Sequence, residues 1–366
     1  MPRLHNFSAG PALLPLSVIE QLIDALPEFD GTGQGLMELS HRSQSFDNVI
    51  VRAEEHLRTL LGIPKSYTVL FLQGGASLQF FMCPLNLLCP GDGADYLMTG
   101  TWSSKALVEA KRCGDARPVW EIQGPLDRVP QDNEYTIRDN SVFVHYTSNN
   151  TIYGTQYSAA PNTNGLALVS DMSSDICSRP IDVAQHDVIY AGAQKNLGPS
   201  GVTLVILSPR ALERSALSDR TRDGGLPSML NYGLMASKRS LFNTPNTFGI
   251  YALERMLSWL KDQGGVGAIE QKNTAKANTL YTELDRSAFW TPYAQPNSRS
   301  IMNVTWTTPS PDLDALFVKE ASDAGLVALR GHRSVGGLRA SIYNACSLDS
   351  INALVSFMQN FESNHG

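Results

Sequence analysis

The chain has 366 residues, and its 29 lysine and arginine residues against 35 aspartate and glutamate residues give a formal net charge of −6. Hydrophobic residues make up 42% of the chain and charged residues only 17%, a composition typical of a well-buried α/β enzyme or an obligate oligomer. The mild acidity argues against nucleic acid or an anionic membrane as a partner. An anionic substrate therefore requires a local cluster of cations.

Strand and helix patterns alternate through the first two thirds of the chain. Apolar residues at helical spacing predict a helix at residues 46–61, which ends at Gly62 before Pro64. Seven apolar runs indicate strands, at residues 67–72, 94–98, 118–122, 142–146, 166–169, 188–190 and 202–207. This alternation predicts an α/β fold with a mainly parallel, seven-stranded sheet flanked by helices on both faces.

The pattern changes near residue 247 and predicts a smaller α+β domain at the C-terminal end. We expect helices at residues 248–260, 268–284, 313–324 and 350–361, and strands at residues 301–306 and 337–343. We therefore divide the chain into a large domain of residues 16–255 and a small domain of residues 256–366. Residues 1–15 are expected to pack near the functional site.

The cysteines and the start of the chain indicate a reducing compartment. The five cysteines contain no C-x-x-C pair, which favours reduced thiols over a disulfide framework or a zinc site; they are Cys83, Cys89, Cys113, Cys177 and Cys346. The first residues have no charged segment followed by an apolar stretch, so we expect no signal peptide. No apolar run reaches the roughly 18 residues of a membrane span. We expect a cytoplasmic protein that holds no metal.

The most informative position is Lys195, which lies among small residues between Ile189 and Gly201. Upstream, Asp171 follows the apolar run at residues 166–169. A carboxylate that closes one buried strand and a lysine that follows another are what a pyridoxal phosphate enzyme needs. The lysine amine forms the Schiff base, and the acid pairs with the protonated pyridine nitrogen. The alternatives are a helix cap for Asp171 and a free lysine at position 195, which would need a carboxylate partner or a strongly depressed pKa.

Three further positions could contact a flat, phosphorylated cofactor. The turn from Gly74 to Ser77 follows a strand and opens a helix, so its free N–H groups offer a phosphate site, although a plain tight turn has the same pattern. Trp102 opens the next helix, where it could stack on an aromatic ring or belong to the core. Thr151 could bind a phenolic oxygen or occupy a turn.

Two cationic pairs could bind a substrate. His41 with Arg42 and His332 with Arg333 each combine a guanidinium group with an imidazole that can donate to an oxyanion. Together with Arg339 they exceed what one carboxylate requires, which indicates a phosphate and a carboxylate on the same substrate. The alternative is a set of ordinary surface side chains.

Taken together, these segments resemble the phosphoserine aminotransferases, a family of fold-type I pyridoxal phosphate enzymes in the class V aminotransferase group. The matching stretches run through nearly the whole chain: NFSAGPA from Asn6, SHRS from Ser40, QGGAS from Gln73, TGTW from Thr99, DMSSD from Asp171, SRPID from Ser178, YAGAQKN from Tyr190, FNTP from Phe242, GHR from Gly331 and RASIYN from Arg339.

The resemblance implies a role for each matching position. Lys195 would carry pyridoxal phosphate, Asp171 would pair with its ring nitrogen and Trp102 would stack on its ring. Thr151 would bond the ring hydroxyl oxygen. The cofactor phosphate would be held by Ala76, Ser77 and Gln194, and by Asn243 and Thr244 from the second subunit of a homodimer. The substrate phosphate or distal carboxylate would be bound by His41, Arg42, His332 and Arg333 from different subunits, and the α-carboxylate by Arg339.

The implied activity is a ping-pong transamination in serine biosynthesis. L-Glutamate would give its amino group to the cofactor, and 3-phosphohydroxypyruvate would take it to become O-phospho-L-serine. Formation of 4-phosphohydroxythreonine in vitamin B6 biosynthesis stays open as a second activity. The alternatives are another class V enzyme, such as an alanine–glyoxylate aminotransferase or a cysteine desulfurase, or a non-catalytic binding protein on the same fold.

Overall fold

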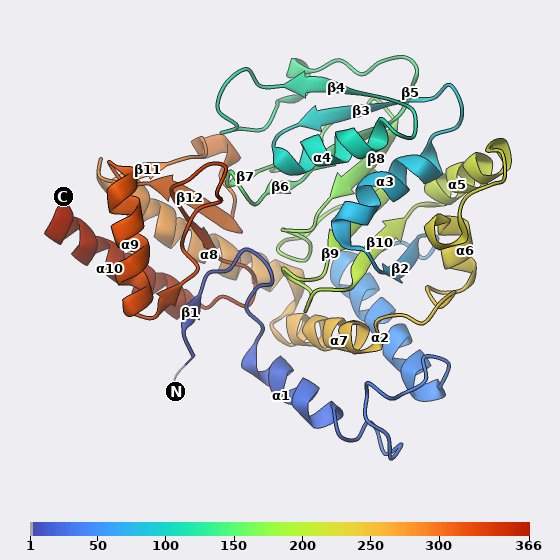
Figure 1. Ribbon diagram of the computed structural model, residues 1–366, viewed down its shortest axis with the longest axis horizontal. Coiled ribbons are helices and arrows are strands. Elements are labelled where there is room, and N and C mark those ends of the chain that lie inside the picture. The colour runs from blue at the N-terminus through green and yellow to red at the C-terminus, as the bar shows by residue number, and fades with distance from the viewer. Residues whose placement is uncertain (1–2) are drawn as a thin grey trace.

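The structure, a computed structural model, describes residues 3–366, and a seven-stranded sheet forms its centre (Figure 1). The strand order is β2-β10-β9-β8-β5-β3-β4. The strands are β2 (Thr68–Leu72), β3 (Gly93–Met98), β4 (Asp115–Glu121), β5 (Ser141–Thr147), β8 (Ala167–Asp171), β9 (Val188–Gly192) and β10 (Thr203–Leu207). Only β10 runs antiparallel to its neighbours β2 and β9; the other pairs are parallel. The predicted mainly parallel α/β sheet is confirmed.

The strands are continuous apolar runs because both faces of the sheet are covered by helices. In β2, Val69 and Phe71 belong to one hydrophobic cluster while Leu70 and Leu72 belong to another, as the two-residue period of a strand requires. The first cluster contains side chains of α1 (Leu16–Ala25), α2 (Gln44–Leu61) and α7 (Thr247–Asp262). The second contains side chains of α3 (Gly75–Leu87), α4 (Thr101–Ala110), α5 (Pro209–Thr221) and α6 (Tyr232–Ser237).

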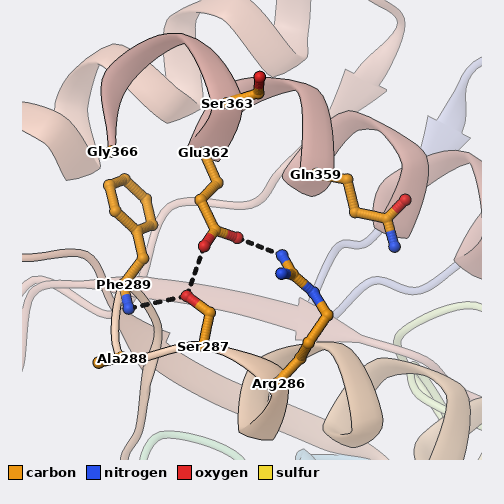
Figure 2. Close-up of a pocket in the computed structure, with 8 residues that line it drawn as sticks. All are labelled: Arg286, Ser287, Ala288, Phe289, Gln359, Glu362, Ser363 and Gly366. Carbon is orange, nitrogen blue, oxygen red and sulfur yellow. Dashed lines mark hydrogen bonds and ion pairs between the residues drawn. The ribbon is translucent and has the colours of Figure 1, made fainter.

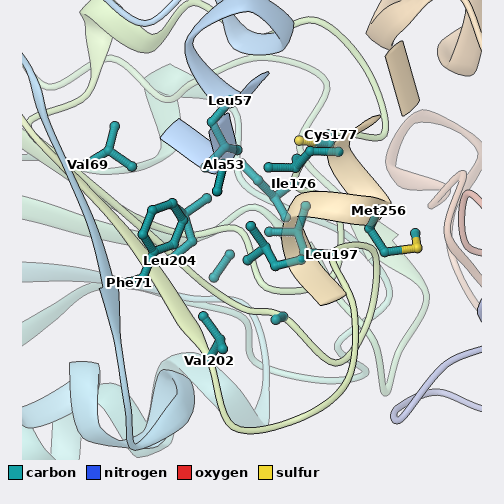
Figure 3. Packing of buried hydrophobic residues seen from close by; sticks show 14 of the residues in the cluster. Ala53, Leu57, Val69, Phe71, Ile176, Cys177, Leu197, Val202, Leu204 and Met256 are labelled. Carbon is teal, nitrogen blue, oxygen red and sulfur yellow. The ribbon is translucent and has the colours of Figure 1, made fainter. Parts of the chain in front are cut away.

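The first cluster also anchors the turn that follows β9. Figure 3 shows Leu197 beside Ile176 and Met256, below Leu57 of α2. Leu197 and Ile176 are fully buried. Complete burial of such a side chain stabilises the fold by about 1.5–3 kcal/mol. The segment that carries Lys195 is therefore held by the core only two residues further along the chain.

The C-terminal residues form a smaller α+β unit with its own core around Trp306 and Phe317. Its elements are α8 (Gly265–Arg286), β11 (Thr291–Pro292), β12 (Asn303–Thr307), α9 (Pro311–Asp323), β13 (Leu326–Val327), β14 (Leu338–Ser341) and α10 (Leu348–His365). Helix α10 begins earlier than predicted because the Ser347 side chain caps it by accepting from the Ser350 amide. Residue 255, the predicted domain limit, falls inside α7, so the division of the chain stays a prediction.

The N-terminal segment joins the small unit rather than the large sheet. Strand β1 (His5–Asn6) pairs in parallel with β13, and Phe7 is buried in the core of the small unit. The remaining short strands, β6 (Asn149–Asn150) and β7 (Thr155–Gln156), form a hairpin after β5. Among residues 3–366, no helix combines the length and apolar content needed to cross a membrane.

Candidate active site

A cavity of about 350 Å³ lies at the carboxyl ends of the parallel strands. Strands β2, β3, β5, β8 and β9 share one direction, because β10 is antiparallel to both of its neighbours. The loops that follow them consequently meet at one edge, which is the usual ligand site of such sheets. The predicted residues that line this cavity are Ala76, Ser77, Trp102, Thr151, Asp171, Gln194, Lys195, His332 and Arg339.

Lys195 is half-buried, and its amine faces the cavity. The Nζ atom donates to Thr151 Oγ1 at 3.1 Å and lies 5.9 Å from the centre of the Trp102 ring. Burial lowers the pKa of Lys195, and the charge of Asp171 partly opposes this effect. Within residues 3–366 the amine has no carboxylate within ion-pair distance. A lowered pKa increases the fraction of neutral amine, which is the nucleophilic form.

Asp171 is the last residue of β8 and is buried on the same wall of the cavity. Its Oδ1 atom accepts from the Ser173 amide at 2.9 Å. Burial raises the pKa of Asp171, while the nearby charge of Lys195 lowers it. A carboxylate has about four acceptor sites, so Asp171 retains capacity to accept from a protonated ring nitrogen.

Ser173 is a site residue that the sequence analysis missed. Its hydroxyl accepts from the Gly192 amide at 3.1 Å, and its own amide holds Asp171. It therefore ties the end of β8 to the end of β9, where Lys195 follows. The available signal was its position two residues after a strand-end aspartate, which is the spacing of an Asx turn.

The first turn of α3 faces the cavity with free backbone donors. Gly74 precedes the helix with φ 90°, and no side chain caps this end. A Cβ atom on Gly74 would come within 2.5 Å of Leu78, so only glycine fits. The amides at Ala76 and Ser77 therefore remain available to an anion at the positive end of the helix dipole.

Two cationic side chains reach the cavity from the small unit. Arg339 on β14 is half-buried, and its Nε atom is buried without a hydrogen-bond partner. Burial lowers the pKa of Arg339, and no carboxylate of residues 3–366 pairs with it. His332 also lines the cavity, and its Nδ1 atom lies 2.7 Å from Ser334 Oγ. An unpaired guanidinium group in a cavity is suited to bind a carboxylate.

The single chain does not bring every predicted residue to this cavity. Arg333 is exposed beside His332 but does not line it. Four other predicted residues also lie outside the cavity. These are His41 and Arg42, which precede α2, and Asn243 and Thr244, which precede α7. The roles of these five residues stay predictions, as do the roles of the residues that do line the cavity.

The residues present fit pyridoxal phosphate. The indole Nε1 of Trp102 and the guanidinium Nε of Arg339 are buried without partners, which is costly unless a ligand supplies one. The cavity also combines an amine of lowered pKa, a buried carboxylate and an uncapped helix end. An aldehyde, a ring nitrogen and a phosphate are the groups that these three features can bind.

A second hollow lacks these features. Figure 2 shows the groove of about 890 Å³ between α8 and α10, where Glu362 lies between Arg286 and Ser287. Glu362 accepts hydrogen bonds from both of these residues and from Trp290. The arginine and the glutamate side chains that line this groove already pair with each other, unlike Lys195 and Arg339 in the first cavity.

Comparison with known proteins agrees with this geometry. Residues 4–354 match the family model described as aminotransferase class-V. The chain is 50% identical over 363 residues to a phosphoserine aminotransferase of Geobacillus kaustophilus, with 99% of each chain covered. It is 48% identical to one from Halalkalibacterium halodurans, with 100% of each chain covered.

Solved structures give the same result. A phosphoserine aminotransferase from Bacillus circulans superposes with a TM-score of 0.94 at 44% identity, covering 100% of this chain and 99% of that one. A structure described as a PLP-bound phosphoserine aminotransferase from Trichomonas vaginalis gives a TM-score of 0.91 at 34% identity, covering 98% of this chain and 100% of that one. The chain belongs to the class V aminotransferase family.

Proposed function

We propose that this chain is a phosphoserine aminotransferase with pyridoxal phosphate as its cofactor. It transfers the amino group of L-glutamate to 3-phosphohydroxypyruvate and yields 2-oxoglutarate and O-phospho-L-serine. The observation that carries the proposal is one cavity that holds the Lys195 amine, the Asp171 carboxylate and the unpaired Arg339 guanidinium group. The names of the full-length relatives support the same substrate pair.

The chain would hold the cofactor through five kinds of contact. Lys195 would hold its aldehyde carbon, Asp171 would keep the proton on its ring nitrogen, and the amides at Ala76 and Ser77 would bind its phosphate together with Gln194. When bound, the cofactor supplies an aldehyde that takes up the amino group and a ring that accepts electrons from the α-carbon. The indole of Trp102 would cover the ring, and the hydroxyl of Thr151 would bind its phenolic oxygen.

Lys195 also moves the proton of the substrate. Once substrate has displaced it, its neutral amine would be a base for the α-proton, and its lowered pKa increases the fraction of amine in the neutral form. The contact with Thr151 keeps the amine inside the cavity. General-base catalysis of this kind contributes typically about 10²–10⁴-fold to the rate.

The cationic residues select the substrates. Arg339 binds the α-carboxylate, which glutamate and 3-phosphohydroxypyruvate share. His332 and Arg333, together with His41 and Arg42, bind the distal carboxylate or phosphate. Because both substrates carry two anions, one set of cations serves both halves of the reaction.

The working enzyme is a homodimer in this proposal. Asn243 and Thr244 lie outside the cavity of their own chain, and they would reach the cofactor phosphate in a second copy. All five cysteines are free, which supports a cytoplasmic location as part of this proposal.

The rival desulfurase activity lacks a reactive thiol near the cavity. Cys177 lies six residues after Asp171 and is fully buried, and burial raises its pKa to about 12. Cys83 is also buried, and burial raises its pKa to about 12 as well. A desulfurase needs an accessible thiolate, and neither side chain can supply one at neutral pH.

The test follows the two half-reactions separately by absorbance of the cofactor-loaded protein near the visible edge. L-Glutamate alone should shift the band, and added 3-phosphohydroxypyruvate should restore it as O-phospho-L-serine accumulates. L-Alanine with glyoxylate is the control for the related transaminase. A protein that gains no band with added cofactor, or responds to alanine but not to glutamate, would disprove the proposal.

A further inference from the structure

Tyr343 joins three parts of the molecule close to Lys195. It lies two residues beyond β14, the strand that carries Arg339, and only 2% of its surface is exposed. Its hydroxyl donates to the Ala9 carbonyl at 2.8 Å and accepts from Asn303 Nδ2 at 3.3 Å. Asn303 in turn accepts from Asn149, which lines the cavity. One phenol therefore links the small unit, the N-terminal segment and the wall of the active site.

The N-terminal segment that Tyr343 contacts is itself part of that wall. Ala9 and Gly10 line the cavity, and a Cβ atom on Gly10 would lie 3.6 Å from Lys195 Cγ. On one side the Phe7 carbonyl accepts from the Ser341 amide at 3.2 Å, and on the other the Ala12 amide donates to the Gln194 carbonyl at 2.8 Å. The segment thus spans from the small unit to the turn that holds Lys195.

The phenol of Tyr343 keeps its proton at the pH of the reaction. Burial raises the pKa of Tyr343 to about 12, although Asn303, Arg339 and Thr151 act in the opposite direction. A phenol has a single proton to donate, and here it goes to the Ala9 carbonyl. The contact therefore persists across the neutral range as a hydrogen bond of fixed direction.

We propose that Tyr343 is a positioning residue whose hydroxyl holds the backbone at Ala9 and Gly10 against the side chain of Lys195. Its relevance to catalysis rests on the proposed function, whereas the contact itself does not. Without the hydroxyl, the segment is fixed only at Phe7 and Ala12, and the aliphatic part of Lys195 loses one rigid boundary. Loss of that boundary lets the amine sample unproductive positions.

The test compares Tyr343→Phe with Tyr281→Phe in the full-length protein. Tyr281 is also buried and also donates to a backbone carbonyl, but that carbonyl belongs to Ser300, at 3.1 Å, and not to the N-terminal segment. Each variant loses one oxygen atom, and Tyr343→Phe also loses the weaker bond from Asn303 Nδ2, which keeps Ser341 Oγ as an acceptor. Both variants should therefore fold and melt at similar temperatures. Hydrogen exchange of the peptide covering residues 8–14, and labelling of Lys195 by an amine reagent in cofactor-free protein, report on the segment directly.

Tyr343→Phe should increase the exchange rate and the labelling rate by about fivefold, the factor that corresponds to one hydrogen bond of about 1 kcal/mol. Tyr281→Phe should change neither rate by more than about twofold, and kcat should fall only in Tyr343→Phe. Equal rates in the two variants, or an unchanged Lys195 labelling rate in Tyr343→Phe, would overturn the inference. If the wild-type protein shows no transamination, the proposed function fails, while the labelling result still decides the role of Tyr343.

Discussion

Two regions of the molecule each enclose a lysine that has no carboxylate partner among residues 3–366. They differ in the groups that accept hydrogen bonds from the lysine amine. At the C-terminal end of β14, Lys276 of α8 is 2% exposed and donates to the carbonyls of Ile342 at 2.8 Å and Tyr343 at 2.7 Å. At the edge of the large sheet, Lys195 donates to one threonine hydroxyl and faces a cavity. Burial lowers the pKa of both, to about 8 for Lys276.

The difference separates a structural lysine from a reactive one. The donors of Lys276 are taken up by backbone carbonyls, so the side chain fastens the end of β14 to α8. The amine of Lys195 keeps N–H donors that are free to bind a ligand and faces an open cavity. The charge of Asp171 raises its pKa. A depressed pKa alone therefore does not identify the catalytic lysine; an open cavity and a nearby acid do.

The strongest test of this contrast is the loss of the amine at Lys195. Lys195→Ala should reduce transamination by at least about 10³-fold, because it removes the group that, in the proposed function, carries the cofactor and moves the proton. Melting temperature should change little, since the side chain forms one hydrogen bond. Kinetics with glutamate and thermal melts measure both effects. Residual turnover within tenfold of the wild type would contradict the assignment of Lys195.

Removal of the acid near Lys195 should have the next largest effect. Asp171→Asn keeps the shape of the side chain but removes its charge, so we expect a loss of about 10²–10³-fold in kcat, as for other groups that stabilise developing charge. In cofactor-free protein the pKa of Lys195 should fall further, because the charge of Asp171 raises it. Rate measurements and a pH titration of Lys195 labelling test the two parts. A variant with normal kcat would leave Asp171 as a structural residue.

Substitution of the structural lysine should affect stability rather than turnover. Lys276→Met keeps the length of the side chain but removes the donor to the Ile342 carbonyl, while the Tyr343 carbonyl keeps the Cys346 amide as a second donor. The free energy of unfolding should therefore fall by about 2 kcal/mol. The kcat of the folded protein should stay within about threefold. Denaturant unfolding and kinetics on the same sample test this contrast; a large loss of kcat with unchanged stability would reverse the roles of the two regions.

The same variant should also change the pH dependence of stability. The pKa of Lys276 in the folded chain, about 8, lies below its usual value of 10.5. Between these two pH values the unfolded chain binds more protons than the folded chain does. The free energy of unfolding of the wild-type protein therefore increases as the pH rises. Lys276→Met lacks this contribution, so the difference between the two proteins should be larger at pH 10 than at pH 7. A constant difference would show that Lys276 does not titrate in this range.

Much of the large unit could be predicted because its signals are local. The strands are apolar runs buried on both faces. Asp171 ends one of them, and Lys195 lies three residues after the end of another. The two-residue strand β1 could not be predicted, since so short a segment shows no periodicity and pairs with residues more than 300 positions away. The role of Ser173 depends on Gly192, and the contact of Tyr343 with Ala9 spans 334 positions. Such contacts arise from tertiary packing, which pattern reasoning does not reach.

The smallest expected effect concerns Arg333, which lies outside the cavity that contains Lys195. Arg333 is exposed and does not line the cavity of its own chain, so Arg333→Ala tests whether the site extends to the surface cations. We expect KM to rise about tenfold for phosphorylated substrates and less for glutamate, because a dianion gains more from each cation than a monoanion does. Arg330→Ala, an exposed arginine three residues earlier, is the matched control and should leave both KM values within about twofold. An equal rise for both substrates would assign Arg333 to general attraction of anions, and no rise would confine the site to the residues that line the cavity.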